Sequence, residues 1–484
     1  MVKKQSKRRR PRRQGKIGKK RQRNRDRIAK AKGRQPCITA NTLYGSSTER
    51  ITAFGGLLGL IKFMDLIDFK PAFECAYVSP KRKPELGCYR MVLGLLMLLF
   101  IGFTRIGHFK YVRADSMVCG ILKVSLLPAV STFWRYLQSL SVLQSQALLR
   151  LMGILRKSVW SLCGYQPKRV SIDLDTTVST VYGQIEESYK GHNTKHRGKK
   201  GLRPVLGFIA ETREYLSGSQ RRGKTITVKE VADLIRGFRD YLPACVKKIL
   251  VRGDGEFIGW ESVKSCEEME FSFIFGNRRC NPPFPKDGWY RHGEYEYNEC
   301  LYKPHGWGSE CRFVVMRISK EKKKDRQLPL FKEEGYSYRI FVTNLKTKPH
   351  NTIRRYDKRA DVENCIGEAQ REGILAIPSK KFHSNQVFFQ LVMLAYNLWR
   401  WMKLLAGTQE KEKRGGEESP GFAGIEIVDN TVRIARLKML YVAAKIVHHG
   451  NRDQVYYSIH ESRAAGILDF LDYLDHRRQL KKAG

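Results

Sequence analysis

The stretch Lys168-Arg169-Val170-Ser171-Ile172-Asp173-Leu174-Asp175-Thr176-Thr177 contains the clearest fold signal in this chain. Its apolar residues alternate with polar ones, which is the period of a β-strand with one buried face. Asp173 and Asp175 therefore lie on the same face of the strand. The sequence predicts a strand that ends in acidic side chains.

Further strands and a helix follow on the C-terminal side. Residues 204–210 form the next apolar run, and Lys248-Ile249-Leu250-Val251 forms another, which leads into Asp254. Between them, Thr227-Val228-Lys229-Glu230 is a capping box that opens a helix to about Tyr241. Strand, helix and strand in this order indicate an α/β sheet whose strand ends form a site.

Residues 37–165, on the N-terminal side, show the period of helices, because apolar side chains recur every three or four positions. Ser131 or Thr132 is expected to cap a helix that brings Arg135 near DNA. Two interpretations stay open here: a helix-turn-helix, and a helical module whose packing alone explains the pattern. The longest apolar run, at 91–103, is shorter than the ~17 to 25 residues of a membrane helix, so we expect no membrane partner.

The C-terminal half begins with residues 277–345, which are rich in Gly, Pro, Tyr and Trp. Strands are expected at 312–318 and 336–345, which indicates a β-rich insertion. A helical pattern follows Asn351 and places Tyr356, Arg359 and Glu363 on one face.

A long apolar helix is expected next, at 386–405. Residues 409–424, rich in Lys, Glu and Gly, are expected to link it to a basic C-terminal region.

The formal net charge is +43, from 90 Lys and Arg against 47 Asp and Glu, which points to nucleic acid as the partner. The first 35 residues contain 18 Lys or Arg and one acid, so we expect residues 1–36 to be a disordered basic arm; a solvated tail without a partner is the alternative. With 42% hydrophobic residues the rest can form cores, which excludes a wholly disordered polycation. Eleven cysteines without a C-x-x-C pair favour reduced thiols and a cytoplasmic location.

Four acids are conspicuous in so basic a chain: Asp173, Asp175, Asp254 and Glu363. Acids in the groove of a protein that binds a polyanion would repel the partner unless metal ions lay between them. A two-metal phosphodiesterase holds two Mg²⁺ about 4 Å apart, and such hard cations prefer carboxylate oxygens. Taken singly, each acid is more simply a surface residue or an ion-pair partner, but the set predicts a metal site.

The same residues resemble the DDE transposases of bacterial insertion sequences. Asp175-Thr176-Thr177 after one strand, Asp254 after another and Tyr356-x2-Arg359-x3-Glu363 on a helix form that pattern. The resemblance is greatest to the family of insertion sequence 1380, in the group whose ribonuclease H-like core is interrupted by β-strands before the last Glu. It extends to Tyr182-Gly183-Gln184, to residues 197–201 and to residues 395–398.

The resemblance implies an α/β fold with a ribonuclease H-like catalytic core, divided into six segments along the chain. These are a disordered basic arm (1–36), a helical DNA-binding region (37–165), the first part of the catalytic core (166–276), the β-rich insertion (277–345), the last part of the core (346–408), and a linker with a basic C-terminal region (409–484).

The resemblance also implies roles for single residues. Asp175, Asp254 and Glu363 would be catalytic and bind two Mg²⁺ ions, or Mn²⁺ in their place; Arg359 would contact a phosphate, and Tyr356 would help to position DNA. Because Asp173, Glu256, Asp361 and Glu368 lie close to these acids in sequence, they compete for the three metal positions.

Two further roles depend on the wider group. A Trp of the insertion would hold a flipped base, and Trp289 and Trp307 are the candidates, although a core position is the alternative for each. The family signature has a Lys seven residues after the Glu, where this chain has Gln370, so Arg371 is expected to take the basic role.

The sequence therefore predicts a transposase that binds the terminal inverted repeats of its own element and cuts and joins DNA, as a homodimer that bridges two DNA ends. A DNA- or RNA-binding regulator without catalysis, such as an inactive derivative of a transposase, would use the same charge. A different metal nuclease on the same core, acting on DNA junctions, is the third hypothesis.

Overall fold

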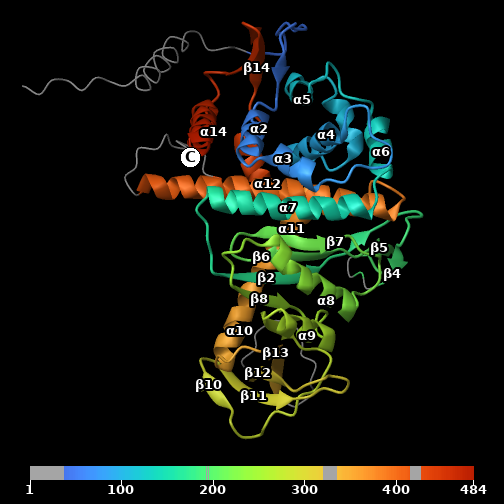
Figure 1. Cartoon of the computed structure of the whole chain (residues 1–484), viewed down its shortest axis with the longest axis vertical. Helices are drawn as coiled ribbons and strands as arrows, with labels where there is room; N and C mark the ends of the chain where they lie inside the picture. The colour runs from blue at the N-terminus through green and yellow to red at the C-terminus, as the bar shows by residue number, and fades with distance from the viewer. Residues whose placement is uncertain (1–37, 192, 194–195, 320–334, 415–426, 484) are drawn as a thin grey trace, which may run out of the picture.

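The computed structural model describes residues 38–191, 193, 196–319, 335–414 and 427–483. They form a mixed α/β protein that is elongated along one axis (Figure 1). A helical part lies at one end, two long helices cross the middle, and a large sheet extends to the other end. The predicted basic arm lies outside the described residues, as does most of the predicted linker.

One mixed sheet of nine strands forms the body of the protein, in the order β10-β11-β12-β13-β9-β8-β2-β6-β7. Its strands are β2 (Arg169–Thr176), β6 (Val205–Ile209), β7 (Glu214–Ser219), β8 (Lys248–Gly253), β9 (Ser272–Gly276), β10 (Tyr290–His292), β11 (Tyr295–Tyr302), β12 (Cys311–Ser319) and β13 (Tyr336–Thr343). β8 runs parallel to β2 and to β9, and the other neighbours are antiparallel. The strands expected at 312–318 and 336–345 are present, and they extend this sheet because β13 pairs with β9.

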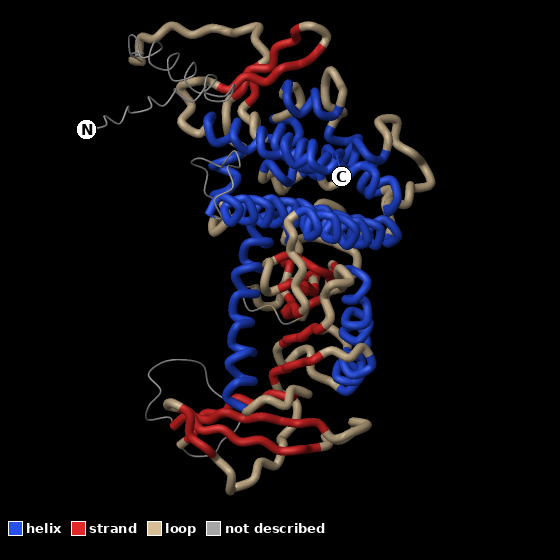
Figure 2. Tube along the Cα trace, turned by 60° about the vertical axis from the view of Figure 1, so that its left-hand side comes forward, coloured by secondary structure: helices blue, strands red, loops and turns tan. Residues whose placement is uncertain are grey.

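Helices cover both faces of the sheet (Figure 2). α8 (Val228–Arg236) and α9 (Trp260–Glu268) lie on one face, and α10 (Pro349–Asp357) and α11 (Asp361–Ala369) lie on the other. The predicted capping box is confirmed, since Thr227 and Glu230 each accept a hydrogen bond from the other's backbone N–H. α8 itself ends at Arg236, and a 3₁₀ turn continues to Tyr241.

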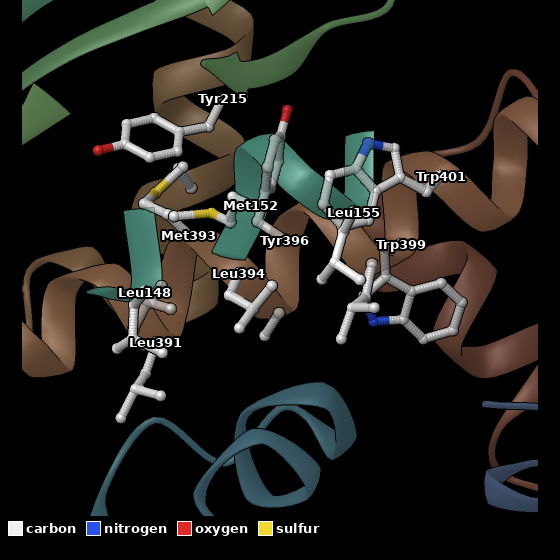
Figure 3. Close-up of a cluster of buried hydrophobic side chains, with 14 of the residues drawn as sticks. Leu148, Met152, Leu155, Tyr215, Leu391, Met393, Leu394, Tyr396, Trp399 and Trp401 are labelled. Carbon is white, nitrogen blue, oxygen red and sulfur yellow. The ribbon is translucent and has the colours of Figure 1, made fainter. Parts of the chain in front are cut away.

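Two long helices, α7 (Val142–Leu162) and α12 (Phe382–Arg414), run side by side beyond β7. Figure 3 shows their shared core, in which leucines and methionines of both helices gather with aromatic side chains of α12, and Met152 and Met393 lie nearest to Tyr215 of the sheet. Trp399 stacks on Phe100 of the helical part at a ring-centroid distance of 4.2 Å. Each fully buried side chain of this size contributes about 1.5–3 kcal/mol, so this core joins the helical part firmly to the sheet. The predicted linker start at 409 was wrong, because α12 continues through Arg414.

The N-terminal helical part is built from short helices around a buried one. They are α2 (Leu57–Leu66), α3 (Phe69–Ala76), α4 (Cys88–Ile101), α5 (Ser116–Leu122) and α6 (Val130–Gln138). In the described part of the chain, no helix combines the length and apolar character needed to cross a membrane. The expected cap at Ser131 or Thr132 was wrong: α6 begins at Val130 after Ala129, so both residues lie inside its first turn and neither caps it.

The two ends of the described chain meet in the helical part. β14 (Ala444–His449) and β15 (Arg452–Tyr457) form a hairpin, and β14 also pairs with β1 (Ile51–Thr52). The last helix, α14 (Ala464–Ala483), lies against α2, and Lys62 forms an ion pair with its Asp475. The basic C-terminal region therefore completes the N-terminal part of the fold.

Candidate active site

The acids after β2 and β8 become neighbours through the register of two parallel strands. Leu174 pairs with Gly253, so the next residues, Asp175 and Asp254, lie beside each other at the carboxyl ends. Adjacent strands are ~4.8 Å apart, and residues in register face the same side of the sheet. The edge formed by the carboxyl ends of parallel strands is where α/β sheets bind ligands.

The electrostatics of Asp175 show how close the acids are. Burial raises the pKa of its carboxyl to about 6, and repulsion by Asp254 and by Glu363 of α11 adds to the rise. Arg359 and the backbone N–H of Thr176, 2.7 Å from Asp175 Oδ1, act in the opposite direction. Asp175 therefore lies close enough to Asp254 and Glu363 for their charges to act on it, and the charge of Arg359 opposes theirs.

Arg359 lies in a 3₁₀ turn between α10 and α11 and is almost fully buried. Its Nη2 donates to Leu174 O at 2.6 Å and lies 3.3 Å from Asp175 Oδ2. A carboxylate that would bind a cation is therefore paired with a guanidinium.

A divalent ion fits the chemistry of these side chains, because Mg²⁺ and Mn²⁺ prefer carboxylate oxygens. Burial raises the pKa of Asp175, so a cation bound beside its carboxylate would favour the charged form. Among the described residues, no three Asp, Glu, His or Cys side chains lie close enough together to hold a metal ion. Coordination would require the Glu363 side chain, which is exposed, to turn inward.

Each of the four competing acids is paired with an arginine. Both oxygens of Asp173 accept hydrogen bonds from Arg252, at 2.6 and 2.8 Å, and Asp173 is buried. Asp361 pairs with Arg213 at 2.7 Å, and Glu368 pairs with Arg400. Glu256 Oε2 accepts hydrogen bonds from Thr176 and Arg203, each at 2.8 Å.

Two polar contacts beside the acids were not foreseen. Gln370 Nε2 donates to Thr177 Oγ1 at 2.8 Å, so the residue after α11 is tied to the end of β2. The Thr176–Glu256–Arg203 chain ties the loop after β8 to the segment before β6. The two threonines of the Asp-Thr-Thr motif were a usable signal for these contacts, whereas nothing in the sequence pointed to Arg203.

The aromatic and basic candidates are spread over the molecule. Tyr356 lies near the acids. Burial raises the pKa of its hydroxyl, the charge of Arg359 lowers it, and the charge of Asp254 raises it. Its ring centroid lies 4.5 Å from that of Phe341. Arg371 is exposed and follows Gln370 directly. Arg135 is exposed on α6, which lies in the helical part, across α7 and α12 from the large sheet (Figure 1).

The two tryptophans lie beside the strands of the insertion and are half-buried. The Arg317 guanidinium lies 3.8 Å above the ring of Trp289. Trp307 packs 6.0 Å from Trp260 and 6.2 Å from Phe313. Both are packed against the core, and their role in stacking on a base stays a prediction.

The family model described as transposase DDE domain group 1 matches residues 44–479. The solved structure of a piggyBac transposase synaptic complex with hairpin DNA is 10% identical over 81% of this chain and 82% of that chain, with a TM-score of 0.41. No curated protein sequence matches the chain. The match over nearly the whole length shows that this chain belongs to the transposase DDE domain group 1 family.

Proposed function

We propose that the protein is a cut-and-paste DNA transposase that binds the terminal inverted repeats of its own element, of the insertion sequence 1380 type found in bacteria. The family membership supports transposase chemistry in general. The observation that carries the specific proposal is the register that sets Asp175 beside Asp254, with Glu363 acting on the same carboxylate.

We propose that β7, β6, β2, β8 and β9, with α8 and α9, are the ribonuclease H-like core. β10 to β13 are then the insertion, since they lie in the chain between β9 and α10. In this arrangement two strand ends and one helix supply the three acids from distant parts of the sequence.

Asp175, Asp254 and Glu363 would hold two Mg²⁺ ions, or Mn²⁺ in their place. When bound, such a pair activates the attacking oxygen and stabilises the leaving oxygen of an in-line phosphodiester displacement. Arg359 keeps Asp175 in place through Leu174 O and balances its charge. Tyr356 in α10, before α11, and the exposed Arg371, after α11, would contact the DNA strand.

The remaining partner residues act at a distance from the acids. Exposed Arg135 of α6 would contact phosphates of the inverted repeat, and Trp289 or Trp307 would stack on a displaced base after a rearrangement of its present contacts. Two such chains would bridge two DNA ends, so the active complex is a homodimer at the bacterial nucleoid.

The test is strand cleavage of a duplex that carries the DNA bordering the gene, with Mg²⁺, by the intact protein and by Asp254→Ala. Cuts at the repeat boundary that need metal and vanish in the variant are the expected result. Cutting by Asp254→Ala at the wild-type rate would overturn the assignment of the site.

The ion pair between Arg359 and Asp175 favours one alternative, a DNA-binding protein that does not cut, because a permanent guanidinium there would replace the cation. Such a protein would bind the same duplex and leave it intact with either Mg²⁺ or Mn²⁺. If the wild-type protein binds this duplex without cutting it, the result would support the DNA-binding protein and contradict the transposase.

A further inference from the structure

A small second sheet lies next to the candidate site. β3 (Ser179–Thr180), β5 (Lys200–Leu202) and β4 (Tyr189–Lys190) form it in that order, and it lies in the chain between β2 and β6. Ser179 follows Asp175 so closely that even a fully extended chain would keep the two within ~14 Å. The small sheet is therefore at the edge of the large sheet where the acids lie.

Hydrogen bonds fix the small sheet relative to the acids. Arg203, directly after β5, donates to Glu256 at 2.8 Å, and Glu256 accepts from Thr176 beside Asp175. On the other side, Ser179 Oγ donates to Ile374 O at 3.4 Å, just beyond α11. The position of the small sheet is thus tied to the elements that bear Asp175, Asp254 and Glu363.

The outer side of this sheet is strongly basic. Six exposed cations lie on it and on the adjoining loop: Lys190, Arg197, Lys199, Lys200, Arg222 and Lys224. Among the ion pairs of the described residues, only Arg222 of this set takes part, with Glu187 at 3.6 Å. The nearby Glu186 is occupied in accepting the backbone N–H of Phe382 at 2.8 Å.

A small, partly open hollow lies between these cations and the loop before α8. Lys199, Arg203 and Asn193 line it, together with Gly191, Gly201 and Gly223. A Cβ on Gly223 would lie 2.1 Å from Gly201 O, so only glycine allows the two segments this approach. Arg203 Nε, a buried donor, has no hydrogen-bond partner in the described structure.

We infer that this basic surface binds the phosphodiester backbone of the DNA strand whose cleavage the acids would catalyse. The inference rests on the proposed function. Three carboxylates repel a polyanion, and cations held at a fixed position beside them offset that repulsion.

The opposite ends of β2 and β8, the strands that lead into Asp175 and Asp254, provide a matched control. Lys168, Lys247 and Lys248 are exposed there, and the backbone N–H groups of Lys247 and Lys248 both donate to Lys168 O. Replacing these three lysines removes the same charge from the edge that faces away from the acids.

The experiment compares the triple variant R197Q/K199Q/K200Q with K168Q/K247Q/K248Q and with the wild-type chain. Binding to a fluorescein-labelled duplex with the DNA bordering the gene is measured by anisotropy over a range of salt concentrations, with EDTA present so that no strand is cut. The slope of log affinity against log salt should become smaller by ~1 for each lost phosphate contact, so by about 3 in the first variant, and stay at the wild-type value in the second. Equal thermal unfolding of all three proteins shows that the folds are intact.

A wild-type slope in R197Q/K199Q/K200Q, or an equal loss in the control, would overturn the inference. Cleavage by the wild-type chain is measured separately. Failure to cut would overturn the proposed catalysis. The difference in binding slopes would still show whether the basic surface binds the DNA backbone.

Discussion

Two carboxylates, Glu214 of β7 and Asp175 of β2, both lie beside an arginine, but their surroundings differ. Glu214 is 1% exposed and accepts hydrogen bonds from Arg156 at 2.8 Å and from the indole N–H groups of Trp160 and Trp401 at 2.7 Å each. The guanidinium of Arg156 is also satisfied, by the carbonyls of Tyr215 and Tyr241. This cluster joins α7 and α12 to the sheet and has no capacity left for a ligand.

Asp175 is the opposite case. Its guanidinium partner lies at 3.3 Å, and two further acids repel its charge. A buried acid with matched donors stabilises the fold, whereas a buried acid with fewer donors and other acids nearby can be stabilised by a cation from outside. The comparison therefore distinguishes a fully paired carboxylate from one that could still accept a ligand.

The largest expected effect is on catalysis. Asp254→Asn keeps the shape of the site and removes one metal-binding charge, so metal-dependent cleavage should fall by ~10³-fold or more, which corresponds to several kcal/mol of transition-state stabilisation. Its unfolding temperature should not fall, because the substitution relieves repulsion with Asp175. Gel assays of cleavage and thermal unfolding measure the two quantities, and a large loss of stability would contradict the comparison.

The matched change in the structural cluster is Glu214→Gln. It leaves the buried Arg156 without its counter-charge, so the free energy of unfolding should fall by about 3–5 kcal/mol. Urea unfolding followed by tryptophan fluorescence measures this, with Asp254→Asn as the control. An unfolding midpoint equal to that of the wild type would show that Glu214 is no more structural than Asp175.

Metal and pH should act on Asp175 in a predictable direction. Because the folded-state pKa is raised to about 6 from 3.8, the native chain binds the proton more tightly than the unfolded chain, so this group lowers stability as pH rises from about 4 to about 6. Mg²⁺ should offset that loss above pH 6, by about 1.4 kcal/mol at ten times its Kd, and much less at pH 5. Thermal unfolding with and without Mg²⁺ at both pH values measures this; Asp175→Asn should show neither effect.

The smallest effect concerns the neutral contact that positions the site. Gln370→Leu and Thr177→Val each remove one partner of the 2.8 Å hydrogen bond, and a double-mutant cycle should give a coupling of about 0.5–1.5 kcal/mol. The coupling should appear in the rate of cleavage as well as in stability, because the bond ties the helix with Glu363 to the strand with Asp175. A coupling near zero in both measurements would contradict this positioning role.

The parts of the fold with local signals could be predicted from the sequence. The alternation at 169–176 gave β2, and the Thr227–Glu230 capping box gave the start of α8. The acids at the two strand ends follow from the parallel order of β2 and β8, which a strand-helix-strand pattern implies.

The rest depended on contacts between distant segments. Nothing near Ile51 indicates that it pairs with Lys445. The Asp-Thr-Thr motif marks Thr177, but nothing beside it identifies Gln370 as the partner. The capping error at Ser131 is local instead: Ala129 is the N-cap of α6, so Ser131 and Thr132 lie inside its first turn. Hydrophobic periodicity predicts which side of an element is buried, but it does not predict which other element packs against that side.

The pairing of β1 with β14 affects the order of events during synthesis on the ribosome. Glu49, just before β1, forms an ion pair with Lys445, and the two are separated by 396 residues along the chain. At a translation rate of about 5–20 residues per second, β14 is synthesised about 20–80 s after β1. The helical end of the protein therefore cannot be completed until almost the entire polypeptide has been translated, and a prematurely terminated chain would lack it.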